Sequence, residues 1–134
     1  MIDWDKLSEF EGPEQSPGFR LWKLSTLWRR QVEAALSKVG LTHPQFVLLA
    51  VTGWLTREGA HVKQVELAKY CGMDINVTSQ VLRALEKRGY VTRNQEDGRS
   101  KSLVVTPEGQ RQIERALPLV EAVDFDFFAP SDTI

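Results

Sequence analysis

The stretch "VELAKYCGMDINVTSQVLRALEKRG", Val65 to Gly89, decides the fold. It holds two amphipathic segments on either side of a short turn, "CGMD". We expect a helix over residues 62–71, ended by Gly72, and a second helix between the N-cap Asp74 and Gly89. The buried stripe of the second helix is expected to consist of Val77, Val81, Leu82 and Leu85. Two helices joined by a Gly-containing turn predict a helix-turn-helix.

A β-hairpin is expected directly after this pair, in "YVTRNQEDGRSKSLVVTPEG", Tyr90 to Gly109. Residues 90–93 and 103–106 are of β-forming types, and Asp97-Gly98 is a strong turn dipeptide. A helix-turn-helix followed by a small hairpin is a winged helix. Its second helix fits the major groove of B-DNA, and a cation at the hairpin tip can enter the adjacent minor groove.

Further helices are predicted on both sides of this unit. Apolar residues recur every three or four positions over residues 19–39, and a nearly all-apolar helix follows the N-cap Thr42. Gly53 within it indicates close packing, and Pro118 predicts a kink or a step in the last helix, which begins near Pro107. The expected fold class is mainly α with a small β-hairpin wing, in a single domain over residues 1–134.

The charge is unevenly distributed, although the net charge is only −1. Residues 1–16 carry one Lys against five Asp and Glu, and residues 112–134 carry one Arg against five acids. Residues 17–61 carry six cations against two acids, and residues 62–111 carry nine against six. This layout permits one positive face for nucleic acid.

The sequence indicates an intracellular protein. No apolar run approaches the roughly 20 residues of a membrane span, and the acidic N-terminal residues lack a signal-peptide pattern. The single Cys71 cannot form an intramolecular disulfide. We therefore expect a cytoplasmic location and no membrane partner.

Several short motifs, in this order and spacing, resemble the MarR family of bacterial transcription regulators over residues 20–123. They are "GLT" and "QF" (40–42, 45–46), "ELA" (66–68), "LEKRGYV" (85–91), Asp97 with Arg99, and "VVTPEG" (104–109). In two positions the chain departs from the pattern: Gln80 stands where Arg is frequent, and Thr78 where an apolar residue is frequent.

The resemblance implies a homodimeric DNA-binding regulator, a repressor released by a small, often aromatic ligand. It implies dimerisation through helices near residues 19–39 and 107–128, with Phe125, Phe127 and Phe128 closing the dimer. The winged helix-turn-helix lobe would span residues 42–106. Two such lobes would meet successive major grooves of a pseudo-palindromic operator, about 34 Å apart.

The candidate DNA-binding residues lie off the apolar stripe of the second helix and in the wing. On the helix they are Asn76, Ser79, Gln80 and Arg83, whose side chains can donate to and accept from base edges. Arg99 at the wing tip is the strongest single candidate, with Asp97 as its orienting partner. Lys101, Ser100 and Lys63 are candidates for phosphate contacts. Arg88 and Arg93 are interpreted as structural ion-pair residues.

Trp28 and Trp54 are candidate walls of a ligand pocket, although large apolar groups on these helices more often belong to a core or dimer interface. Cys71 is interpreted as a small core residue rather than a redox switch. His43 and His61 lack metal-ligand spacing, so no metal or cofactor is expected.

Two alternatives remain open from the sequence. A winged-helix module for protein contacts, with weak or lost DNA binding, is compatible with Gln80 and the near-neutral charge. An enzyme is disfavoured because the sequence has no nucleophile elbow, metal cluster or phosphate-cradling Gly loop.

Overall fold

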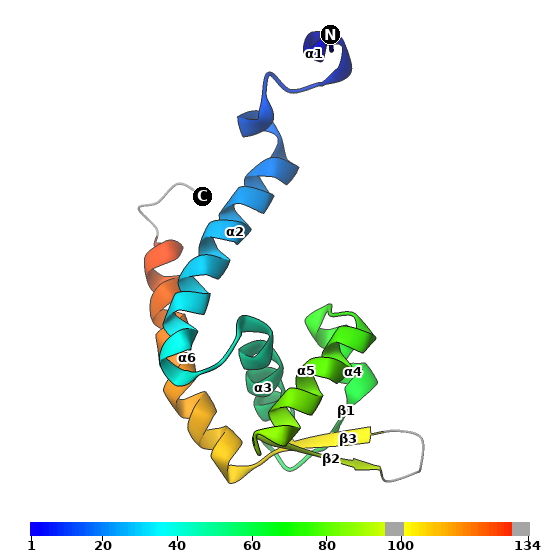
Figure 1. Cartoon of the computed structure of the whole chain (residues 1–134), viewed down its shortest axis with the longest axis vertical. Helices are drawn as coiled ribbons and strands as arrows, with labels where there is room; N and C mark the ends of the chain where they lie inside the picture. Colours follow the sequence, from blue (N-terminus) through cyan, green and yellow to red (C-terminus); the bar gives the residue numbers. More distant parts are fainter. Residues whose placement is uncertain (96–100, 130–134) are drawn as a thin grey trace.

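The computed structural model describes residues 1–95 and 101–129 (Figure 1). A long helix and the last helix lie side by side, and a compact lobe of three helices and a small sheet sits beside their lower ends. The elements are α1 (Trp4–Leu7), η1 (Pro13–Gln15), α2 (Pro17–Leu36), η2 (Ser37–Val39), α3 (His43–Leu55), β1 (Val62–Lys63), α4 (Gln64–Cys71), α5 (Ile75–Lys87), β2 (Val91–Gln95), β3 (Lys101–Val105) and α6 (Pro107–Phe127). The predicted fold class is confirmed.

The helix-turn-helix consists of α4 and α5, and the predicted second helix starts at its expected cap. The Asp74 carboxylate accepts hydrogen bonds from the backbone N–H groups of Asn76 and Val77, at 2.8 and 3.2 Å. Gly72 ends α4 with a φ of 64°, a left-handed conformation that glycine adopts without steric cost.

The predicted helix over residues 62–71 was wrong at its start. Val62 and Lys63 form a short strand, β1, which pairs with Leu103 and Ser102 of β3, so the sheet has the order β1-β3-β2. Val62 is buried in the lobe core, where a β-branched residue suits a strand. A two-residue strand exists because β3 offers it a free edge, which no local pattern indicates.

Pro118 lies inside the last helix and does not end it, and the kink or step expected there stays a prediction. The helix α6 continues from Pro107 to Phe127 through this residue. Pro118 and Glu114 are both exposed, so the Glu114 carbonyl that loses its helical partner can be hydrated.

The helix α3 is central, as predicted. It packs against α2, α5, α6 and β3, and it buries Phe46, Leu48, Leu49 and Thr52. A Cβ on Gly53 would lie 2.9 Å from Cδ1 of Ile113, so the close packing expected at this glycine is confirmed.

Among the described residues, no single helix combines the length and apolar character of a membrane span. Only the pair Pro17–Val39 and His43–Leu55, bent by 75°, meets both criteria when taken together.

Among the described glycines, Gly109 of α6 has the least room for a side chain. A Cβ there would lie 2.1 Å from the backbone oxygen of Tyr90 and 2.8 Å from Cγ1 of Val105. The backbone cannot yield as a flexible side chain would, so Gly109 is required where α6 crosses the start of the wing.

We expect Gly109→Ala to lower the free energy of unfolding by about 3 kcal/mol, because the added methyl group separates α6 from the wing. Gly18→Ala is the matched control, since a Cβ on Gly18 meets no atom within 4 Å and should change stability by less than about 1 kcal/mol. Denaturant unfolding of both variants tests this, and equal stabilities would contradict it.

Candidate nucleic-acid interface

The helix α5 presents one buried and one exposed face. Thr78, Leu82 and Leu85 are buried against the lobe core, and Val81 packs beside them. Val77, expected in the buried stripe, is 45% exposed and lies on the outer face instead. The buried face of α5 is therefore narrower than the sequence pattern predicted, and its exposed face is wider.

Thr78 is fully buried where the family pattern favours an apolar residue. Its hydroxyl donates to the carbonyl of Asp74, four residues earlier, at 2.8 Å. This bond satisfies the hydroxyl within the helix, so Thr78 fills an apolar position without an unpaired polar group.

Three of the candidate base-reading residues share one exposed stripe. Asn76, Gln80 and Arg83 are spaced by four and three residues, so they follow each other along one side of α5. Ser79 is half-buried at the margin. Within the described part of the chain, no hydrogen bond or ion pair engages these three exposed side chains, which are therefore available to an external partner.

The wing is anchored to α5 through Arg93 of β2. Its guanidinium pairs with the carboxylate of Glu86 on α5 at 3.3 Å and donates to Oε1 of Gln64 on α4 at 3.0 Å. The Arg93 side chain is only 8% exposed. The predicted structural ion pair at Arg93 is confirmed, and it sets the base of the wing relative to α5.

Arg88 is structural too, although it pairs with a carbonyl rather than a carboxylate. It donates to the backbone oxygen of Gly40 at 2.7 Å, and its guanidinium lies 4.9 Å from the centre of the Tyr90 ring.

The wing tip lies outside the described residues. Asp97, Arg99 and Ser100 belong to it, and for Lys101 only the backbone is described, paired with Gln95. Lys63 is exposed where β1 meets α4, and its backbone N–H donates to the Glu66 carboxylate at 3.1 Å.

Trp54 lines a pocket of about 760 Å³ between α3, β3 and α6. Val51, Tyr70, Ile113 and Leu117 add apolar surface to it. Arg57 stacks on the Trp54 ring at 3.6 Å, which places a cation beside an aromatic wall.

Trp28 is not brought into this pocket. Its indole N–H donates to the Asp124 carboxylate at 2.7 Å, and its ring meets His43 edge-on at 5.1 Å. Phe128 lies 6.2 Å from the same ring. Trp28 therefore connects α2, α3 and the end of α6. It does not lie in the same pocket as Trp54.

Cys71 is half-buried and packs against the hydrophobic core. Burial raises the pKa of its thiol, which disfavours the reactive thiolate. Both observations favour the packing role predicted for Cys71.

Burial lowers the pKa of His43. The carboxylates of Glu33 and Asp124 oppose this shift, and the guanidinium of Arg29 adds to it. The neutral form is therefore favoured on folding. The stability that this provides is present above the unfolded pKa of about 6.5 and is lost as the pH falls toward the lower folded pKa.

We expect thermal stability to fall between about pH 7 and pH 5.5 in the native chain, and to fall less in His43→Asn. Thermal unfolding of both proteins across this range measures the difference. A native chain that gains stability relative to His43→Asn on acidification would show that the pKa is raised instead.

A model described as the MarR family matches residues 41–101. Over 130 residues, the chain is 42% identical to the uncharacterized HTH-type transcriptional regulator YdcH of Bacillus subtilis, across 96% of this chain and 87% of that protein. It is 33% identical over 109 residues to the HTH-type transcriptional repressor Rv2887 of Mycobacterium tuberculosis, across 80% of this chain and 76% of that protein.

Solved structures of Rv2887 share the fold. Its complex with DNA has a TM-score of 0.68 at 28% identity, over 88% of this chain and 86% of that chain. Its complex with p-aminosalicylic acid has a TM-score of 0.68 at 30% identity, over 88% of both chains. Sequence and structure agree with the motifs of the helix-turn-helix and wing, and the chain belongs to the MarR family of transcriptional regulators.

Proposed function

We propose that the protein is a homodimeric, sequence-specific DNA-binding repressor that a small molecule releases from its operator. The exposed stripe of Asn76, Gln80 and Arg83, without partners among the described residues, is the observation that carries this proposal. The similarity to Rv2887, a repressor solved in complex with DNA, supports it. The protein would act in the cytoplasm as a binding protein rather than an enzyme.

The recognition helix α5 would enter the major groove. Asn76 and Gln80 would hydrogen-bond adenine edges, Arg83 would contact guanine or phosphate, and Val77 would meet a thymine methyl group. Ser79 lies at the margin of this surface. Lys63 and Lys101 would contact phosphates, and Arg99, oriented by Asp97, would enter the minor groove.

Each candidate base contact can be tested by truncation. We expect Asn76→Ala, Gln80→Ala and Arg83→Ala each to weaken binding to the selected operator by about 1–3 kcal/mol, with little change in thermal stability. Selection of duplexes from a random library, followed by titration, measures this. The selected motif should contain half-sites about one helical turn apart.

Lys6→Ala is the control for general loss of charge, because Lys6 is exposed on α1, outside both the lobe and the proposed dimer helices. Binding should weaken steeply with salt as phosphate contacts release counterions. Equal losses in Lys6→Ala and Arg83→Ala, or an affinity indifferent to salt, would contradict DNA recognition by α5. A library that yields no motif would favour the protein-interaction alternative.

The dimer would form through the helices near residues 19–39 and 107–128, with the lobe of residues 42–106 on each side. Along α2, Phe19, Leu21 and Trp22 are 38%, 69% and 69% exposed, and Phe125 near the end of α6 is 83% exposed. Figure 1 shows the N-terminal part of α2 extending beyond the lobe. Apolar surface of this extent is typical of a protein interface.

We expect the double variant Trp22→Ala/Phe125→Ala to shift the protein toward monomer, because it removes two large apolar side chains from the interface. Val65→Ala is the matched control, since Val65 is 64% exposed on α4 and outside the proposed interface. Sedimentation equilibrium measures the dimer fraction. A dissociation constant unchanged in the double variant would place the interface elsewhere.

The pocket beside Trp54 is the candidate effector site. Its apolar walls and the Arg57 guanidinium suit an aromatic carboxylate, the class to which p-aminosalicylic acid and salicylic acid belong, and Rv2887 is solved with both.

We expect salicylate to quench tryptophan fluorescence and Arg57→Gln to weaken its binding about tenfold, because the carboxylate loses its cation. The same titration with benzyl alcohol, which lacks the carboxylate, should show no difference between the native chain and Arg57→Gln. Salicylate affinities that are equal in both proteins would exclude Arg57 from the effector site.

A further inference from the structure

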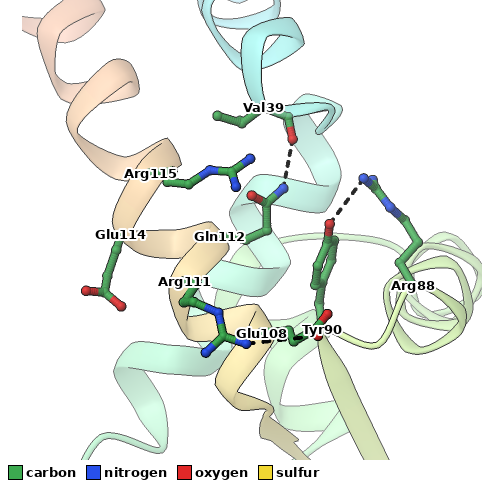
Figure 2. A pocket seen from close by; sticks show the side chains of 8 residues that line it. All are labelled: Val39, Arg88, Tyr90, Glu108, Arg111, Gln112, Glu114 and Arg115. Atoms are coloured by element: carbon green, nitrogen blue, oxygen red, sulfur yellow. Dashed lines mark hydrogen bonds and ion pairs between the residues drawn. The ribbon is translucent and has the colours of Figure 1, made fainter.

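A second pocket, of about 670 Å³, lies where the lobe meets η2 and α6 (Figure 2). Two side chains hold the backbone turn at its edge. Gln112 of α6 donates from Nε2 to the carbonyl of Val39 at 2.8 Å, and Arg88 donates to the carbonyl of Gly40 at 2.7 Å. The pocket is therefore framed by hydrogen bonds that join α6 to η2, and Arg88 to the residue that follows η2.

Three guanidinium groups line this pocket: those of Arg88, Arg111 and Arg115. Arg111 is partly neutralised by Glu108, at 3.9 Å between exposed groups. Glu114 also lines the pocket, but Figure 2 shows its carboxylate directed away from Gln112. Arg115 has no ion pair among the described residues, and the balance of charge favours an anion.

Gln112 contributes a polar atom without a partner. The residue is 4% exposed, and its Oε1 atom is buried without a hydrogen-bond donor in the described structure. An unpaired buried acceptor is costly, so a ligand or side chain that supplies a donor gains free energy. Because Nε2 already donates to the carbonyl of Val39, the Gln112 amide cannot flip to give Oε1 a hydrogen-bond donor.

We propose that this pocket binds a small oxyanion that also carries a hydroxyl group, either free phosphate or a hydroxycarboxylate. Its negative oxygens accept hydrogen bonds from Arg115 and Arg88, and its hydroxyl donates to Oε1 of Gln112. Arg115 is exposed and carried by the same helix as Gln112, so it can move aside to admit the ligand. Five of the eight residues that line this pocket are charged, whereas mainly apolar residues line the pocket beside Trp54.

The location gives such a ligand a structural consequence. Arg88 follows α5 directly, whereas Arg111, Gln112 and Arg115 belong to α6. A bound anion would join the recognition helix to α6 and so influence the position of the lobe. This consequence rests on the proposed DNA-binding function, but binding of the anion does not.

Isothermal titration at constant ionic strength tests the site with two matched pairs of probes. Phosphate and sulfate are similar in size, but only phosphate carries a hydroxyl at neutral pH; malate and succinate differ in the same way. We expect binding of phosphate, malate or both, with each hydroxyl-bearing anion at least about tenfold tighter than its counterpart. A preference confined to one pair identifies the source of the ligand.

Arg115→Gln should weaken binding of the preferred anion about tenfold, whereas Arg20→Gln should leave it unchanged. Gln112→Met should abolish the preference for the hydroxyl-bearing anion, and thermal unfolding checks that this variant folds. Absence of binding by all four anions, equal binding within both pairs, or equal losses in Arg115→Gln and Arg20→Gln would overturn the proposal. None of these readouts requires DNA, so failure here is distinguishable from failure of the proposed function.

Discussion

The structure depends on one junction, where Thr106 joins the two ends of the wing to the start of α6. Its hydroxyl donates to the Gly89 carbonyl at 2.5 Å and accepts from the Gly109 backbone N–H at 3.0 Å. Its own N–H donates to the carbonyl of Tyr90 at 3.0 Å. One residue thus ends the sheet, caps α6 and holds the turn that follows α5. Gly109 then allows α6 to pass against the Tyr90 backbone, so the recognition helix and α6 have a defined relation.

This junction helps to fix α5 in the lobe while one face of the helix stays available to a binding partner. Its inner face is committed to the core through Leu82, Leu85 and the self-satisfied Thr78. Arg93 and Glu86 join it to the wing from the side. What remains is the outer face, on which Asn76, Gln80 and Arg83 have no competing partners among the described residues. A rigid support with an uncommitted polar face is the arrangement that base recognition requires.

The two candidate ligand sites also lie where the lobe meets α6. The apolar pocket beside Trp54 and the arginine-lined pocket beside Gln112 lie along different sides of this helix, with Glu114 at the edge of both. Both sites include α6 and parts of the lobe, so a ligand in either would act on the same relation that Thr106 and Gly109 define. Both candidate ligand sites thus lie where the DNA-binding lobe is attached to α6.

The sequence by itself determined the order of helices, the cap at Asp74, the terminating glycines and the exposed residues Asn76, Gln80 and Arg83, because each depends on neighbours within one or two turns. It also identified Arg93 and Gly53 as structural positions. Other features required residues distant in the chain. The strand at Val62 exists because it can pair with β3. Val77 faces outward because the core contacts a narrower face of α5 than the sequence pattern predicted. Trp28 and Trp54 are separated because Asp124 engages the first and Arg57 the second. Pairing, burial and side-chain partners arise only when distant segments meet, and the tertiary structure alone decides them.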